Sequence, residues 1–182
     1  MKIILLNGSP RSNGKTAEAL ALVEEGLKEN GVETVNMWIG NKPVRGCIDC
    51  RNCFKTQRCA FNDDICNEII EALIDADGIV IGSPIYFGSA NGALCSIIDR
   101  VFYAGSTFAH LFDGKIGASL ATGVWLGGTA TLDRINKYYI SSAMKIVTAP
   151  EYTLYMSDVP DARKERITEN FKNLGRLIAN EA

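Results

Sequence analysis

The chain has 182 residues, of which 47% are hydrophobic and 22% charged, with a formal net charge of −2, and we expect residues 1–182 to form one globular domain. A phosphate backbone requires a basic face, so this charge balance argues against nucleic acid as a partner. No apolar run is long enough to span a membrane or to act as a signal peptide, and we therefore expect a cytoplasmic protein with no membrane contact.

The first predicted strand, residues 3–6, runs directly into a loop of small, polar and basic residues that opens a helical pattern. The N–H groups at the start of a helix have no partner inside it and lie at the positive end of its dipole. A phosphate there gains several charge-assisted hydrogen bonds. An ordinary capped turn is the alternative, but the density of hydroxyls, cations and glycines favours a phosphate-binding loop. Its candidate residues are Ser9, Arg11, Ser12, Asn13, Gly14, Lys15 and Thr16.

Beyond this loop, short apolar runs alternate with helical patterns. Strands that are apolar on both faces and separated by helices indicate a parallel sheet covered on both sides. We therefore predict an α/β fold, a flavodoxin-like, doubly wound five-stranded parallel sheet in a three-layer sandwich. The later strands are predicted at residues 34–39, 78–81, 115–122 and 144–147, and the helices at residues 16–30, 63–74, 94–101, 132–139 and 160–178.

Three loops rich in small residues each follow a predicted strand, at residues 9–16, 83–88 and 122–128. We expect the third strand to end where Gly82-Ser83-Pro84 begins. In an open parallel sheet, ligands bind beyond the carboxyl ends of the strands. The three loops are therefore expected to meet at one pocket.

A long stretch without periodicity, residues 41–62, contains four of the six cysteines, Cys47, Cys50, Cys53 and Cys59. Without a secretion signal, such cysteines are expected to be thiols, metal ligands or redox groups. The first three have the spacing that bacterial ferredoxins use for a [4Fe–4S] cluster. Zinc held by four thiolates and free thiols that shape a ligand pocket are the other two interpretations.

These motifs in this order resemble the NADPH-dependent FMN reductase family. The resemblance rests on Gly8-Ser9-Pro10-Arg11, on the four cysteines followed by Asp63-Asp64, and on residues 83–88 followed by Ile98-Asp99-Arg100. It covers roughly residues 1–130, and the cysteine loop brings the chain nearest to the iron–sulfur flavoprotein branch. The resemblance implies a flavodoxin-like fold, one FMN per subunit and assembly as homodimers or homotetramers.

The resemblance also implies roles for individual residues. By position, Ser9, Arg11, Asn13 and Thr16 would hold the FMN phosphate, with Ser12, Gly14 and Lys15 lining the same loop. The isoalloxazine ring would be bordered by Pro84, Ile85, Tyr86, Phe87 and Gly88. Its other side would be closed by Thr122, Gly123, Gly127 and Gly128.

A flavin also suits the predicted pocket on chemical grounds, because FMN needs a cradle for a dianionic phosphate and a slot for a flat ring. We expect hydride transfer from NAD(P)H to FMN and release of the electrons to a small-molecule or protein acceptor. This chemistry requires no protein acid or base, which agrees with the single histidine, His110. Tyr86, Phe87 and Trp125 are candidates for ring contact or for ordinary packing. With a [4Fe–4S] cluster, the protein would be an electron carrier.

A nucleotide hydrolase is the remote alternative, because Gly14-Lys15-Thr16 is similar to the end of a P-loop. The glycine that a P-loop requires five positions before Gly14 is Ser9. No magnesium-binding aspartate follows the strand at residues 78–81. No G-x-G-x-x-G fingerprint appears either, so the nicotinamide donor is expected to bind transiently against the flavin.

Overall fold

The computed structural model describes residues 1–124, 126–150, 153–156 and 160–181. Its sheet has the strand order β2-β1-β3-β5-β6, and all four pairings along this path are parallel. These strands are β1 (Lys2–Asn7), β2 (Glu33–Trp38), β3 (Gly78–Tyr86), β5 (Ile116–Gly123) and β6 (Lys145–Ile146). The order confirms the predicted flavodoxin-like winding, in which the switch point lies between β1 and β3.

Two further short strands make the described sheet seven-stranded, where the sequence predicts five. The strand β4 (Ser89–Ala90) pairs with β3 in the antiparallel direction, and β7 (Leu154–Met156) pairs with β5 in parallel. The predicted end of the third strand at Ile81 is wrong, because β3 continues to Tyr86. Residues 82–84 continue the ladder because β5 runs alongside them, with Pro84 opposite Thr122.

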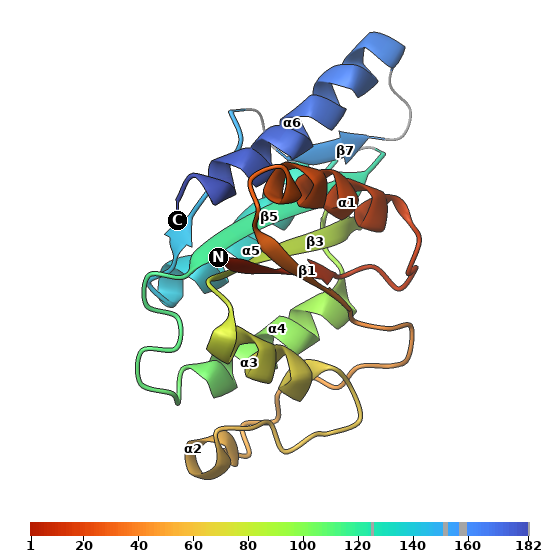
Figure 1. Ribbon diagram of the computed structural model, residues 1–182. Helices are drawn as coiled ribbons and strands as arrows, with labels where there is room; N and C mark the ends of the chain where they lie inside the picture. The colour runs from red at the N-terminus through yellow and green to blue at the C-terminus, as the bar shows by residue number, and fades with distance from the viewer. Residues whose placement is uncertain (125, 151–152, 157–159, 182) are drawn as a thin grey trace.

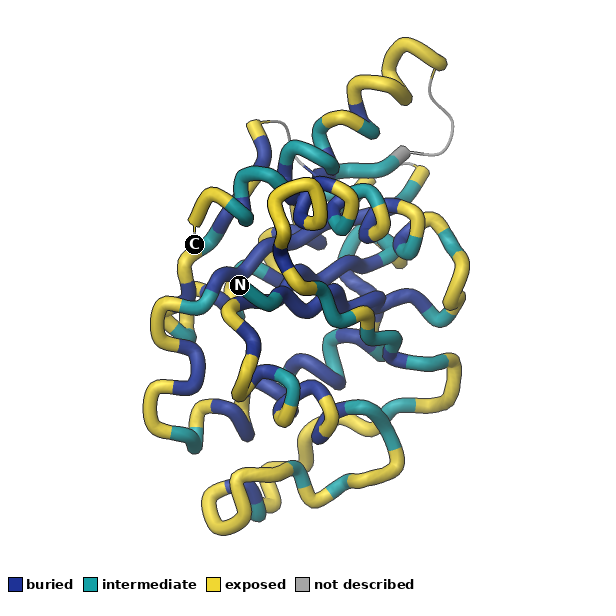
Figure 2. The backbone as a smooth tube through the Cα atoms, in the orientation of Figure 1, coloured by how far each residue is buried: buried dark blue, intermediate teal, exposed yellow. Residues whose placement is uncertain are grey.

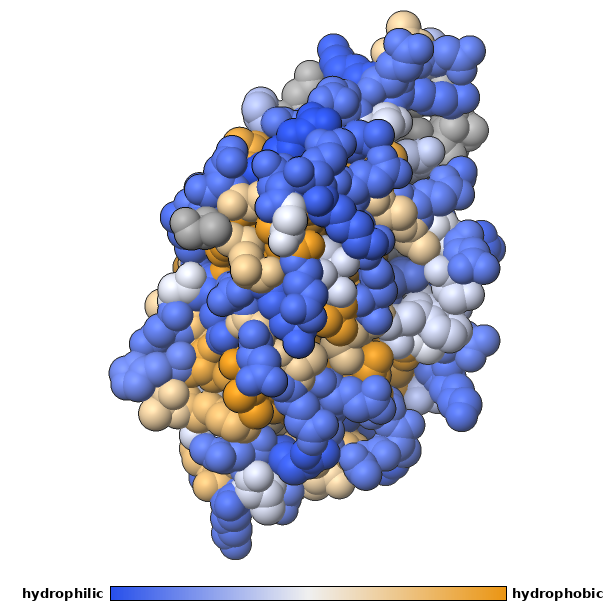
Figure 3. Space-filling model, viewed as in Figure 1, coloured by the Kyte–Doolittle hydropathy of each residue, from blue (hydrophilic) through white to orange (hydrophobic). Residues whose placement is uncertain are grey.

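Helices cover both faces of the sheet and form the outer layers of the sandwich (Figure 1). On one face lie α1 (Lys15–Lys28) and α6 (Asp161–Ala179). On the other lie α3 (Cys66–Asp75), α4 (Gly92–Gly105) and α5 (Gly128–Ser141). The outward surfaces of α1 and α6 are mainly hydrophilic on the face shown in Figure 3. Among the described residues, no helix has the length and apolar character needed to cross a membrane.

The alternation of β1 explains why the core is divided into two halves. Ile3 and Leu5 pack with α1 and α6, whereas Ile4 and Leu6 pack with the helices on the opposite face. All four side chains are buried, because a strand at the centre of a doubly wound sheet presents apolar residues on both faces. Figure 2 shows this buried centre and, far from it, the exposed cysteine loop with the four-residue helix α2 (Cys53–Thr56).

Two glycines allow α1 and α6 to approach closely. A Cβ atom at Gly26 would lie 2.0 Å from the carbonyl oxygen of Lys172, and one at Gly175 would lie 2.2 Å from that of Val23. These neighbours are backbone atoms, so they move only if a helix moves. The position of α1, and of the loop that precedes it, therefore depends on α6.

We expect Gly26→Ala to reduce the free energy of unfolding by about 1–3 kcal/mol, because the added methyl group overpacks the contact between the helices. Urea denaturation measures this loss. The matched control is Gly92→Ala in α4, where an added Cβ meets no atom within 4 Å. Equal stability of the two variants would contradict the prediction.

Candidate functional site

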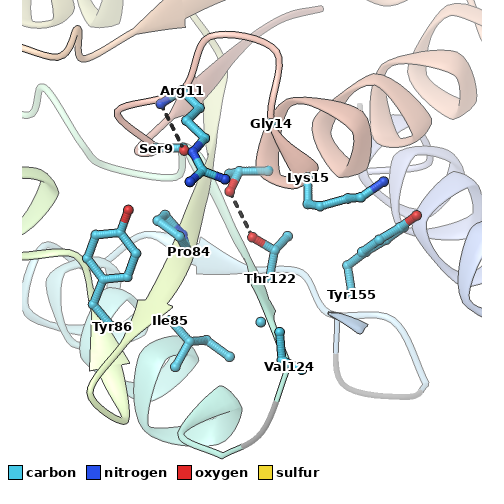
Figure 4. A pocket seen from close by; sticks show the side chains of 12 residues that line it. Ser9, Arg11, Gly14, Lys15, Pro84, Ile85, Tyr86, Thr122, Val124 and Tyr155 are labelled. Carbon is cyan, nitrogen blue, oxygen red and sulfur yellow. Dashed lines mark hydrogen bonds between the residues drawn. The ribbon is translucent and has the colours of Figure 1, made fainter. Parts of the chain in front are cut away.

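A pocket of about 220 Å³ lies at the carboxyl edge of the sheet, where the three predicted loops meet (Figure 4). From the loop after β1 and the start of α1 it is lined by Ser9, Arg11, Gly14, Lys15 and Thr16. From β3 it is lined by Pro84, Ile85 and Tyr86, and from β5 and the residues that follow it by Thr122, Gly123 and Val124. Tyr155 of β7 completes the lining.

The first turn of α1 faces this pocket without a side-chain cap. Gly14 is the N-cap residue, with φ −89° and ψ −176°, and it makes no side-chain cap hydrogen bond to the first turn. The capped-turn alternative therefore does not apply at this helix. Uncapped N–H groups at the positive end of a 14-residue helix are suited to bind an anion.

Hydroxyl groups from two of the loops meet inside the pocket. The Oγ1 atoms of Thr16 and Thr122 lie 2.8 Å apart and are buried. The backbone N–H of Arg11 donates to Ser9 Oγ at 3.1 Å. Because this oxygen acts as an acceptor there, the hydroxyl hydrogen of Ser9 remains free to donate to a ligand.

The two cations of the loop lie at different edges of the pocket. The Arg11 side chain extends into the pocket in the direction of Thr122 (Figure 4). Lys15 Nζ lies 2.7 Å from a carboxylate oxygen of Glu18 and 5.7 Å from the ring centre of Tyr155. Its hydrogen bond to Glu18 raises the pKa of Lys15 above the ordinary value, so the ammonium stays charged.

The opposite side of the pocket, here called the slot, is lined by the ends of β3 and β5. An added Cβ at Gly123 would lie 2.7 Å from Cδ1 of Ile85, so a side chain there would crowd Ile85. At the end of the slot, an added Cβ at Gly127 would lie 2.3 Å from Cα of Gly88. The loops after β3 and β5 therefore touch through their backbones.

Six of the predicted pocket residues do not line this pocket. Phe87 is fully exposed, with φ 48° in the turn between β3 and β4, and that turn directs its side chain outward. The others are Ser12, Asn13, Gly88, Gly127 and Gly128. Trp125 lies outside the described residues. Val124 and Tyr155 line the pocket but were not predicted, and the stretch around Tyr155 has no periodicity that could have indicated it.

The four cysteines of the loop at residues 41–62 line one small hollow, about 20 Å³ in volume, together with Arg100 and Tyr103. Cys47 and Cys50 are exposed, Cys59 is half-buried and Cys53 is buried, and burial raises the pKa of the Cys53 thiol. Across the described residues, no three His, Cys, Asp or Glu side chains are arranged to hold a metal ion. The four cysteine sulfurs are of the type that binds soft metals. In this conformation, however, they are not arranged as a ligand set.

The carboxyl-terminal end of the cysteine loop is fixed to the body of the protein. Arg100 in α4 is buried, forms an ion pair with Asp64 at 2.5 Å and donates to Cys59 Sγ at 3.6 Å. The Asn67 side chain accepts the N–H of Cys59 and donates to the carbonyl oxygens of Cys59 and Phe61. The loop is also attached nearer its start, where the hydroxyl of Tyr103 donates to Asp49 Oδ1 at 3.0 Å, although Cys47 and Cys50 on either side remain exposed.

We expect Arg100→Leu to reduce the free energy of unfolding by about 3–5 kcal/mol, because it leaves the largely buried Asp64 carboxylate without a counter-charge. Adding Asp64→Leu should recover most of this loss, as urea denaturation can show. The exposed pair between Arg45 and Asp63 is the control, since Arg45→Leu should cost at most about 1 kcal/mol. A double variant no more stable than the single one would contradict the prediction.

The sequence is similar to a known family and to individual known proteins. The family model described as NADPH-dependent FMN reductase matches residues 1–160. An iron–sulfur flavoprotein of Methanocaldococcus jannaschii is 29% identical, covering 98% of this chain and 96% of the relative. An iron–sulfur flavoprotein of Methanosarcina thermophila is 35% identical, covering 68% of this chain and 63% of the relative.

Solved structures share the fold at lower identity. A flavone reductase superimposes with a TM-score of 0.74 at 19% identity, covering 99% of this chain and 62% of the other. An archaeal flavodoxin superimposes with a TM-score of 0.64 at 18% identity, covering 99% of this chain and 97% of the other. An NADH:FMN oxidoreductase superimposes with a TM-score of 0.65 at 18% identity, covering 96% of this chain and 88% of the other.

Proposed function

This chain belongs to the NADPH-dependent FMN reductase family, and from that membership we propose that it binds FMN in the pocket at the carboxyl edge of the sheet and oxidises NAD(P)H. The observation that carries the proposal is the uncapped first turn of α1, which opens into a pocket with hydroxyls and an arginine. The same family match and the flavodoxin-like winding argue against the nucleotide hydrolase considered from the sequence.

The phosphate half of the pocket fits a dianion. The helix supplies uncapped N–H groups, Ser9 supplies a hydroxyl hydrogen, and the guanidinium of Arg11 supplies charge and a donor pair. The contact between Thr16 and Thr122 fixes two further hydroxyls beside these groups. In this proposal, Ser12 and Asn13 approach the phosphate from the exposed side of the loop.

The slot over the ends of β3 and β5 suits a flat, partly apolar ring. Pro84, Ile85 and Tyr86 form one wall, and Gly123 and Val124 form the other. When bound, FMN would supply the redox chemistry, namely hydride acceptance from NAD(P)H and electron transfer to an acceptor. The role of these residues is to orient the ring and to exclude water from its covered face.

No histidine lines the pocket. His110 lies at the surface, where Nδ1 is 2.6 Å from a carboxylate oxygen of Asp113. The proposal therefore assigns no proton-transfer role to a side chain, in keeping with chemistry carried by a cofactor.

We also propose that the chain acts as a homodimer or homotetramer. Tyr86, Phe87, Val124 and Leu126 are exposed apolar residues on the two loops that meet beside the slot. Exposed apolar groups gathered in this way are typical of contact surfaces. A small-molecule or protein acceptor would reach the flavin through the part of the slot that such an assembly leaves open.

We expect Arg11→Ala to weaken FMN binding by about 2 kcal/mol, or roughly thirtyfold, because a charge-assisted contact to the phosphate is lost. Titration followed by quenching of flavin fluorescence measures this change. Riboflavin has no phosphate, so its affinity should be unaffected. The control is Lys28→Ala, which removes a cation from the opposite end of α1. Unchanged FMN affinity in Arg11→Ala would place the phosphate elsewhere.

A second candidate function is that of an iron–sulfur flavoprotein. It is favoured by the four thiols that line one hollow and by the names of the relatives. Thiolate sulfur is the ligand that iron–sulfur clusters take. Since the exposed Cys47 and Cys50 are not held in a ligand set, formation of a [4Fe–4S] cluster would require them to move toward Cys53 and Cys59.

Under this second function, Cys53→Ser should abolish bound iron and leave FMN in place, because the hollow is separate from the flavin pocket. Iron, sulfide and flavin per subunit are measured on anaerobically prepared protein. The control is Cys95→Ser, which removes a thiol of α4 that does not line the hollow. If wild-type protein contains flavin but no iron, the iron–sulfur function is excluded and the reductase proposal stands without a cluster.

A further inference from the structure

Both backbone polar groups of Ser9 are held by side chains from outside the phosphate loop. Asn7, the last residue of β1, accepts the N–H of Ser9 at Oδ1, 3.0 Å away. Trp38, the last residue of β2, donates its indole Nε1–H to the carbonyl oxygen of Ser9 at 2.7 Å. The two side chains come from register partners in the β1–β2 pair. Neither residue lines the pocket.

The rest of the loop is attached in the same manner. Asn7 Nδ2 lies 3.4 Å from each of the carbonyl oxygens of Arg11 and Ser12. Asn91, the N-cap residue of α4, donates from Nδ2 to the carbonyl oxygen of Gly8 at 2.8 Å. Asn7 and Asn91 are both buried. A change in loop conformation would leave their buried amides without partners, and that carries a free-energy cost.

The contact to Trp38 bears on the ligand through Ser9. When both sides of Ser9 are fixed, its Oγ is held where it accepts the N–H of Arg11 and where its own hydrogen is free. A loop held in this conformation before binding has little entropy left to lose when a phosphate arrives. A loop without the contact would have to be ordered by the ligand.

We propose that Trp38 is a positioning residue for the phosphate of the flavin: through its indole N–H it sets the orientation of Ser9 without touching the ligand. This inference rests on the proposed FMN site. Trp38 lines a different hollow, with Asn7 and Ser12 between α1 and β2, and shares no lining with the pocket. Its link to the pocket is therefore the indole N–H that donates to Ser9.

The test is Trp38→Phe in the full chain, because phenylalanine removes the N–H donor and keeps an aromatic ring, although a smaller one. The affinities for FMN and for riboflavin are measured by quenching of flavin fluorescence. Loss of one hydrogen bond that orients the phosphate site should weaken FMN binding about threefold to tenfold. Riboflavin affinity should change by less than about twofold, since its ring slot is built by β3 and β5.

Asn7→Ala is the second variant, and it keeps the proposal testable if Trp38→Phe folds poorly. It removes the other contact to Ser9 and should also weaken FMN more than riboflavin. The two substitutions together should weaken FMN by less than the product of their separate effects, because both act on one residue. The matched control is Tyr103→Phe, which removes an aromatic donor to Asp49, 3.0 Å away in the cysteine loop, and should leave both affinities unchanged.

Unchanged FMN affinity in Trp38→Phe, or an equal loss for FMN and riboflavin, would overturn the positioning role. Failure of the FMN site itself has a different signature. Wild-type protein would then show no preference for FMN over riboflavin, and Arg11→Ala would have no effect. In that case the FMN site is absent, and the positioning role of Trp38 is excluded together with it.

Discussion

The uncapped first turn of α1 is the constraint on which the rest of the site depends. Most helices complete their first turn with a side-chain acceptor, but here Gly14 occupies the N-cap position and provides none. The nearby hydroxyls of Ser9 and Thr16 are engaged with Arg11 and Thr122 instead. The positive end of the helix therefore remains available to an anion from outside the chain. The parallel sheet places this end beside the slot over the ends of β3 and β5, which brings the proposed phosphate and ring sites together.

The two unusual loops of the chain differ in how completely their ligand residues are held. The phosphate loop is fixed along its length by Asn7, Trp38 and Asn91, which are attached to three different elements. The cysteine loop is fixed at Cys59 by Arg100 and Asn67, and its first two cysteines are exposed. The first arrangement suits a ligand that enters a prepared site. The second suits a ligand that completes the folding of its own site, as metal centres commonly do.

Much of the fold could be predicted from the sequence, because apolar runs alternating with helical patterns leave few arrangements other than a parallel, doubly wound sheet. The convergence of three loops followed from that winding. The extent of β3 could not be predicted, since Gly82-Ser83-Pro84 is typical of a turn and is kept extended only by β5. Tyr155 and Trp38 were missed for a related reason. Their partners are backbone or side-chain groups far away in sequence, and only the register of the folded sheet brings them close.

The close packing of α1 on α6 has a consequence for how the cofactor site can be damaged. The matched family region ends at residue 160, before α6 begins. Yet α6 meets α1 through Gly26 and Gly175, and it adds an ion pair between Lys172 and Glu25. The carboxyl-terminal helix thus supports the helix that opens the proposed flavin site, although none of its residues lines that pocket. A truncation or a bulky fusion at that terminus would loosen cofactor retention from a distance.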